Sequence, residues 1–190
     1  MLKEVEGIII SETNYGETSK IINILTNDGI VGVMAKGSKS LKSPLRSYTQ
    51  KFTYGKFYLY YKENKLSILK SVDIIDDLIS IKTNIELIGY LSYISDLIYQ
   101  IMKQNYDKDL YNLYINAILK INDGLNPKII CNIVELKGLD YLGVGINFNT
   151  CVKCGSMKNI ITINPDEGGY ICKNCYTNEK YHDEKTLKML

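Results

Sequence analysis

Four cysteines near the C-terminal end of the sequence have the spacing of a metal site. Two residues separate Cys151 from Cys154, two separate Cys172 from Cys175, and seventeen lie between the two pairs. A two-residue spacer lets a tight turn aim both sulfurs at one ion, and two such turns complete a tetrahedron of thiolates. Four protein ligands leave no coordination position for water, so we expect one structural Zn²⁺ per chain without a hydrolytic role.

Two other uses of these cysteines stay open. The same four ligands suit an iron–sulfur cluster, and two disulfides are the remaining option. Disulfides are the poorer explanation because the strongest apolar run near the start, residues 7–10, is too short for a secretory signal. No run approaches the roughly 20 apolar residues of a membrane span. We therefore expect a cytoplasmic protein with no membrane partner.

Candidates for catalysis are scarce. His182 is the only histidine, and the acids around it are typical of a solvated side chain. Residues 32–40, GVMAKGSKS, are similar to a nucleotide-binding loop, but Ser38 separates Gly37 from Lys39. A Walker A loop needs its Lys directly after the Gly so that it reaches the β- and γ-phosphates. We expect neither nucleotide hydrolysis nor another enzyme activity.

Basic residues gather in one part of the sequence. Residues 36–65 hold eight Lys and Arg against one acid, whereas residues 73–109 hold seven acids against three bases. This asymmetry favours a polyanionic partner for the first stretch, and a solvated lysine-rich surface is the alternative. The residues that we expect to contact backbone phosphates are Lys36, Lys39, Lys42, Arg46, Lys51 and Lys56.

The segments up to about residue 72 are rich in β-forming residues. Asn27-Asp28-Gly29 is the signal of a tight hairpin, and a second polar turn covers residues 62–65. Around Gly55 the aromatic pattern shifts by one residue, which indicates a bulge. Five short strands of which one is bent favour a small OB-like barrel over a flat sheet with exposed edges. Tyr58 and Tyr60 alternate with the inward positions and are candidates to stack on bases.

Beyond residue 72 the apolar period becomes helical. Thr83 and Glu86 fit a capping box for a first helix, and Asp107 favours the start of a second. Asn126 followed by Pro127 begins a third, which ends near Gly143 and carries Cys131 as a buried thiol. The apolar stripes of the first two helices are Leu87, Leu91, Ile94, Ile98 and Ile101, and Leu110, Leu113, Ala117 and Ile121.

These patterns predict an α+β protein. An N-terminal OB-like β-barrel is followed by an all-α helical domain with an inserted four-cysteine zinc finger. The expected boundaries are 1–74 for an OB-fold DNA-binding domain, 75–148 for the helical domain, 149–178 for the zinc segment and 179–190 for a C-terminal helical tail.

In order and spacing, several motifs resemble the bacterial RecO family of recombinational repair mediators. Residues 7–52 contain Tyr-Gly-Glu at 15–17, Ala-Lys-Gly at 35–37 and Ser-Pro-Leu-Arg at 43–46. The resemblance resumes at ELKGLDYLGVGINFNTCVKCG and at GGYICKNC. Members of that family typically continue with further helices after the second cysteine pair, whereas this sequence ends fifteen residues after Cys175. We expect either that part of the helical domain is missing from this sequence or that the protein is short in this lineage.

The resemblance implies a nucleoid-associated protein that binds single- and double-stranded DNA. It also implies annealing of complementary strands and, together with RecR, loading of RecA onto DNA coated by single-stranded-DNA-binding protein. Contact with the acidic C-terminal tail of that protein, without ATP, is part of the same expectation. The alternative from a different class is a zinc-ribbon adaptor that binds only proteins.

Overall fold

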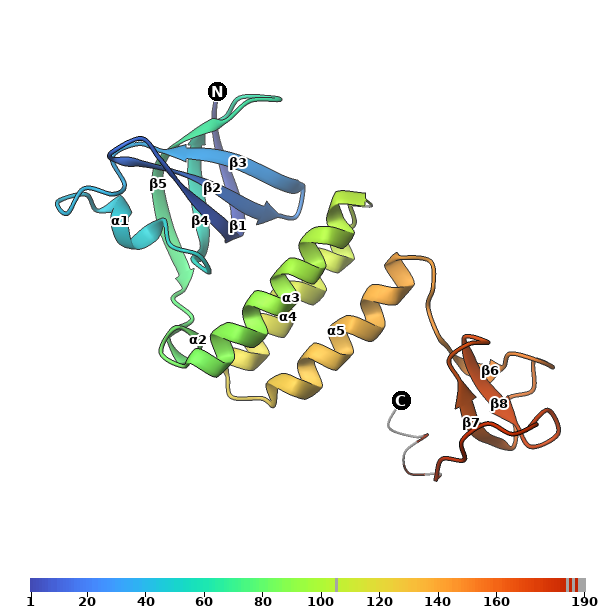
Figure 1. Cartoon of the computed structure of the whole chain (residues 1–190). Coiled ribbons are helices and arrows are strands. Elements are labelled where there is room, and N and C mark those ends of the chain that lie inside the picture. Colours follow the sequence, from blue (N-terminus) through green and yellow to red (C-terminus); the bar gives the residue numbers. More distant parts are fainter. Residues whose placement is uncertain (105, 184, 186, 188–190) are drawn as a thin grey trace. The chain divides into compact units, whose positions relative to one another are not determined.

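The computed structural model describes residues 1–104, 106–183, 185 and 187, and it divides into two compact units, Met1–Val134 and Glu135–Leu190. The first unit begins with a closed barrel, which confirms the predicted OB-like architecture (Figure 1). Its strands are β1 (Leu2–Tyr15), β2 (Ser19–Thr26), β3 (Gly29–Ala35), β4 (Tyr54–Tyr60) and β5 (Ser67–Asp76).

The strands are ordered β1-β2-β3-β5-β4, and the pairing of β4 with β1 closes the barrel. All neighbours are antiparallel except β3 and β5, which meet in a short parallel contact. Each of these five strands therefore has two partners, which protects the edges that would otherwise promote aggregation. Inward-facing side chains alternate with outward ones and fill the interior. The barrel core consists of Val5, Ile9, Ile22, Ile24, Val33, Ala35, Phe57, Leu59, Leu69 and Val72.

Two local features set the register of the barrel. Gly29 has a φ of +117° directly after the Asn27–Asp28 turn, as the hairpin prediction requires. The β4–β5 register shifts between Tyr54 and Gly55, which confirms the predicted irregularity. A Cβ atom on Gly55 would lie 2.5 Å from the carbonyl oxygen of Asp73, so only glycine allows this approach of the two backbones.

Helices follow or interrupt the strands, and those with described bounds are α1 (Leu45–Tyr48), α2 (Ile79–Lys82), α3 (Ile85–Gln104), α4 (Lys108–Asn122) and α5 (Pro127–Tyr141). The three long ones are those predicted, and α3 lies beside α4 (Figure 1). Cys131 is buried, as expected. Within the described parts of the chain, no helix has the length and apolarity that crossing a bilayer requires.

The helix ends agree with the sequence signals except at α3. Asp107 and Asn126 accept backbone N–H groups at the starts of α4 and α5, and Gly143 has a φ of +75° after α5. The predicted capping by Thr83 is wrong. Thr83 follows the last residue of α2, where its hydroxyl donates to the carbonyl of Ile79, and the Asn84 side chain caps α3 instead.

The second unit contains a three-stranded sheet ordered β6-β8-β7, from β6 (Asn147–Cys151), β7 (Ile160–Asn164) and β8 (Gly169–Cys172). The hydroxyl of Tyr170 donates to the carbonyl of Leu187 at 2.7 Å, and this contact fastens the C-terminal segment to the sheet. Part of the predicted helical tail, residues 184, 186 and 188–190, lies outside the described residues.

Two glycines of the first unit should respond to alanine in opposite directions. Gly55→Ala forces the β4 and β5 backbones apart and should lower the free energy of unfolding by about 1–3 kcal/mol. Gly89→Ala, at an exposed position in the second turn of α3 with nothing within 4 Å of the added Cβ, should raise it by about 1 kcal/mol. Urea unfolding followed by far-UV circular dichroism measures both. Equal effects would contradict the assigned role of Gly55.

Candidate metal centre and nucleic-acid interface

The four predicted metal ligands come together in the second unit. Their Sγ atoms all lie within 4.8 Å of one another. Cys151 is the last residue of β6 and Cys172 is the last residue of β8. Because β6 and β8 are paired, the two cysteine-containing turns that follow these strands lie close together. The N–H of Gly155 donates to the carbonyl of Cys151 at 2.8 Å, and that of Cys175 to Cys172 at 3.0 Å. The sheet therefore builds the site that the spacing predicts.

The ionisation of these thiols fits a bound cation. Burial opposes ionisation of Cys151, but backbone N–H groups, first that of Cys172, lower its pKa to about 6. A hydrogen bond with Cys154, burial and the other nearby sulfurs raise the pKa of Cys175 to about 12. Four thiolates this close repel one another unless a cation neutralises them. The Sγ atoms of Cys154 and Cys172 are 3.6 Å apart, well beyond the roughly 2.05 Å of a disulfide.

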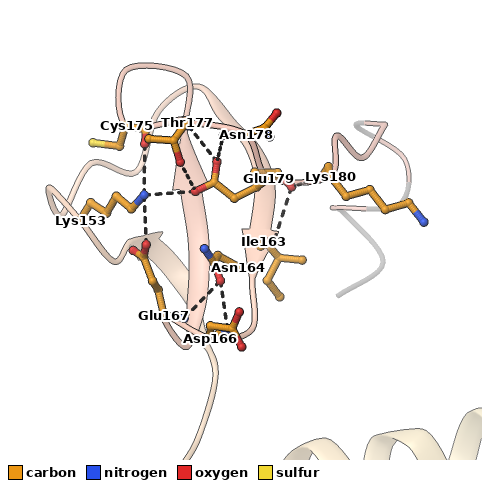
Figure 2. A network of polar contacts seen from close by, with 11 residues as sticks. Lys153, Ile163, Asn164, Asp166, Glu167, Cys175, Thr177, Asn178, Glu179 and Lys180 are labelled. Carbon is orange, nitrogen blue, oxygen red and sulfur yellow. Dashed lines mark hydrogen bonds and ion pairs between the residues drawn. The ribbon is translucent and has the colours of Figure 1, made fainter.

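Lys153 connects the two cysteine turns (Figure 2). Its Nζ lies 3.1 Å from carboxylate oxygens of both Glu167 and Glu179, and it donates to the carbonyl of Cys175 at 3.4 Å. These carboxylates raise the pKa of Lys153. The pKa of Glu179 is lowered, first by the N–H of Thr177. Lys153, which lies between Cys151 and Cys154, thus contacts both the turn that ends at Cys175 and the connection between β7 and β8 that contains Glu167.

The connection after β3 contains four of the predicted phosphate contacts, and we call its residues 36–46 the basic loop. Lys39 N–H donates to the carbonyl of Thr18 at 2.8 Å, and Lys39 Nζ donates to that of Gly16 at 3.3 Å. Ser38 is fully buried and donates to the carbonyl of Ala35 at 2.8 Å. These contacts fix the loop against the β1–β2 turn.

Most cations of the basic loop lack an acidic neighbour. Lys36, Lys42 and Arg46 are exposed, and their side chains make no ion pair within the described part of the chain. Lys39 is partly exposed. Their positive charge is therefore available to an external anion.

The other predicted contacts lie apart from this loop. Lys51 lines a pocket of about 350 Å³ beside Asp96 and Tyr99 of α3, with its Nζ 4.7 Å above the ring of Phe52. Lys56, on β4, is paired with Glu4 of β1 at 3.1 Å. The charge of Lys56 is thus balanced within the chain, whereas the Lys51 side chain packs over an aromatic ring.

The two predicted stacking tyrosines point outward from β4, as expected. The hydroxyl of Tyr58 donates to Asp73 at 3.0 Å, which fixes its ring against β5. Tyr60 is half exposed. Of the pair, Tyr60 has the freer ring face.

A groove that the sequence did not single out lies between β3 and the β4–β5 loop. Its volume is about 430 Å³, and Lys62 and Lys65 are among its lining residues together with Tyr61 and Gly32. Both lysines belong to the basic stretch, but their place in a turn hid their relation to β3. Small barrels of this type bind oligonucleotides at the face of strands 2 and 3 and at the β4–β5 loop. Knowing this, one could have predicted Lys62 and Lys65 as candidate contacts from their place in the loop between the last two strands.

Removing the Lys153 bridge should loosen the metal centre. Lys153→Met leaves two carboxylates without their cation and releases the second turn, so metal-loaded protein should lose its ion to EDTA several-fold faster than wild type. Lys173→Met, in the second turn, is the matched control because the Lys173 side chain forms no such bridge within the described residues. Elemental analysis after desalting measures the retained metal. Equal release from the two variants would contradict the bridging role.

Comparison with known proteins agrees with this architecture. The family described as "Recombination protein O N terminal" matches residues 1–78, and "Recombination protein O C terminal" matches residues 82–190. A "DNA repair protein RecO" from Bacillus pumilus is 32% identical over 183 residues, which cover 95% of this chain and 71% of the relative. A protein of the same name from Listeria monocytogenes is 30% identical over 194 residues, covering 100% of this chain and 76% of the relative.

The two family matches together account for the barrel, the helices and the cysteine-rich unit. The Bacillus subtilis "DNA repair protein RecO" is similar to the same extent, at 31% identity over 183 residues. The resemblance that the sequence motifs suggested is thereby confirmed. This chain belongs to the RecO family of DNA repair proteins.

Proposed function

We propose that this protein binds single- and double-stranded DNA without sequence preference and anneals complementary strands. The observation that carries the proposal is the basic loop, in which the exposed cations Lys36, Lys42 and Arg46 have no acidic partner in the described structure, and which is tied to the β1–β2 turn through Lys39. A loop with a fixed backbone suits a polyanion because little loop entropy is lost on binding. Phosphate contacts position a nucleic acid but do not read its sequence.

In this proposal, single-stranded DNA runs along β3 between the basic loop and the groove that contains Lys62 and Lys65. The basic loop begins at Lys36, directly after β3, and the groove with Lys62 and Lys65 includes Gly32 of the same strand. Four residues of extended strand span about 13 Å, which is the length of two or three nucleotides. Tyr60 is a candidate stacking platform, since single-strand binders pair a basic groove with aromatic rings. Annealing follows when two shielded strands share one charged surface.

The partners that we propose are those of the family resemblance. With RecR, the protein helps to load RecA onto DNA coated by single-stranded-DNA-binding protein, and it contacts the acidic tail of that protein. The role requires no covalent chemistry, in keeping with a sequence that has one histidine and an interrupted nucleotide-binding loop. A place on the nucleoid in the cytoplasm follows from this role.

For the metal centre we propose one Zn²⁺ per chain, held by Cys151, Cys154, Cys172 and Cys175. Zinc favours four thiolates in a tetrahedron and, when bound, supplies a cross-link between the two cysteine turns. The chain's own contribution is the Lys153 bridge and the two strand ends that position the sulfurs.

A protein-only adaptor is the second candidate function. A groove of about 500 Å³ in the second unit favours it, because Asp166 is among the lining residues and would suit a basic side chain of a peptide, whereas the lining Glu167 and Glu179 already pair with Lys153. The two proposals differ in what they predict for charge reversal in the basic loop. The adaptor's binding to its protein partner should not change when the charge of the basic loop is reversed.

Reversing the charge of the basic loop should weaken DNA binding strongly. In the triple variant Lys36→Glu, Lys39→Glu and Arg46→Glu, repulsion replaces attraction at three phosphate contacts. Affinity for a fluorescent single-stranded oligonucleotide should fall at least a hundredfold at low salt, and the slope of log K against log salt should become shallower by about 2. Annealing of complementary oligonucleotides without nucleotide, which wild type should accelerate, should return to the protein-free rate.

The matched control changes net charge equally but elsewhere. The triple variant Lys108→Glu, Lys120→Glu and Lys128→Glu alters exposed positions on α4 and α5 and should bind and anneal like wild type. Circular dichroism checks that both proteins are folded. Unchanged affinity in the loop variant, or the same loss in both variants, would refute the proposed interface.

Metal content provides a separate check on the second unit. Elemental analysis of protein purified without added metal should find about one zinc per chain. Cys172→Ser removes one of four ligands and should reduce this content to near zero. Iron accompanied by visible absorbance would overturn the zinc assignment.

A further inference from the structure

Leu41 stands out in the basic loop because it is apolar and almost fully exposed. Its exposed fraction is 83%, although Lys39 and Lys42 are close to it in the sequence. A single exposed apolar side chain is ordinary on a protein surface. The position of Leu41 is unusual in that its neighbours are the cations that we propose to contact phosphates.

The loop around Leu41 is ordered by successive backbone turns. Ser40 N–H donates to the carbonyl of Gly37, and Ser43 N–H donates to that of Ser40, each at 3.1 Å. A third bond of 3.1 Å joins Arg46 N–H to the carbonyl of Ser43. Leu41 is therefore the second residue of the turn 40–43, and the turn holds it away from the protein interior.

The same loop contains a leucine that serves folding. Leu45 packs against the barrel core, and its carbonyl accepts the hydroxyl of the buried Thr49 at 2.7 Å. With Ser38 buried on the other side, the loop is anchored before and after Leu41. Fold stability thus depends on Leu45, whereas Leu41 contributes little buried surface to the first unit.

We infer that Leu41 is a wedge that enters between neighbouring bases of DNA whose phosphates lie on Lys39, Lys42 and Arg46. Base faces are apolar and phosphates flank every base step, so an apolar side chain between cations matches that arrangement. Proteins that kink or unstack nucleic acids insert leucine and similar side chains in this way. The turns keep Leu41 in position before DNA binds, which lowers the entropy cost of insertion.

This inference rests on the proposed DNA binding and adds a step to it. A wedge that unstacks bases opens local structure in a single strand and exposes base edges to a complementary strand. The basic loop would then hold the backbone while Leu41 keeps one step open. Annealing should consequently depend on Leu41 more strongly than single-strand affinity does.

The test compares Leu41→Ala with Ile85→Ala. Ile85, at the start of α3, is a matched control because it is 84% exposed and lies outside the basic loop. The probe is an oligonucleotide, single-stranded or duplex, with one 2-aminopurine, whose fluorescence rises on unstacking. Wild type and Ile85→Ala should raise the fluorescence at saturation. Leu41→Ala should give no rise, and its duplex affinity should fall about tenfold, as expected when most of a leucine side chain no longer leaves water.

The salt dependence of binding separates this inference from the proposed function. Leu41→Ala should keep the wild-type slope of log K against log salt, because no phosphate contact is removed. Wild type that binds DNA without a fluorescence rise, or a rise that survives in Leu41→Ala, overturns the wedge and leaves DNA binding intact. Wild type that fails to bind DNA at all overturns both.

Discussion

The pairing of β1 with β4 is the contact on which the first unit depends. It joins residues 2–8 to residues 54–60 and turns five strands into a closed barrel. Closure fixes both ends of the chain between β3 and β4, which contains the basic loop. Because the loop is also tied to the β1–β2 turn, its cations are held by the barrel and do not depend on their own local propensity. On the other side of β4, Gly55 allows the strand to approach the backbone of Asp73 on β5.

A different constraint governs the second unit. A sheet of three short strands buries little apolar surface, and small units of this kind usually need a cross-link or metal for stability. The four sulfurs lie at strand ends, so a shared cation would join segments that the sheet itself connects weakly. Lys153 adds a second link through its two carboxylate partners. Folding and metal binding are therefore expected to be coupled there.

Charge shows how a linear count of residues can mislead about a surface. Lys56 and Lys36 belong to the same basic stretch of sequence, yet Lys56 forms an ion pair with Glu4 of the adjacent strand β1, while Lys36 has no acidic partner in the described structure. Strand pairing brings acids from distant segments next to β4. A loop has no such cross-strand neighbour, so its cations keep their charge uncompensated. The same reasoning separates Leu45, which packs against the barrel core, from the exposed Leu41.

The sequence by itself determined the barrel, the three long helices, the β4 irregularity and the four cysteines that could hold a metal ion. Each depends on local spacing: alternation in strands, helical stripes, a glycine at a bulge and two-residue gaps between cysteines. Tertiary structure decided that Asn84 rather than Thr83 caps α3, that Lys56 is paired, and that Lys62 and Lys65 share a groove with Gly32. These features depend on which segments lie side by side, and residues distant in sequence carry no local signal of that proximity.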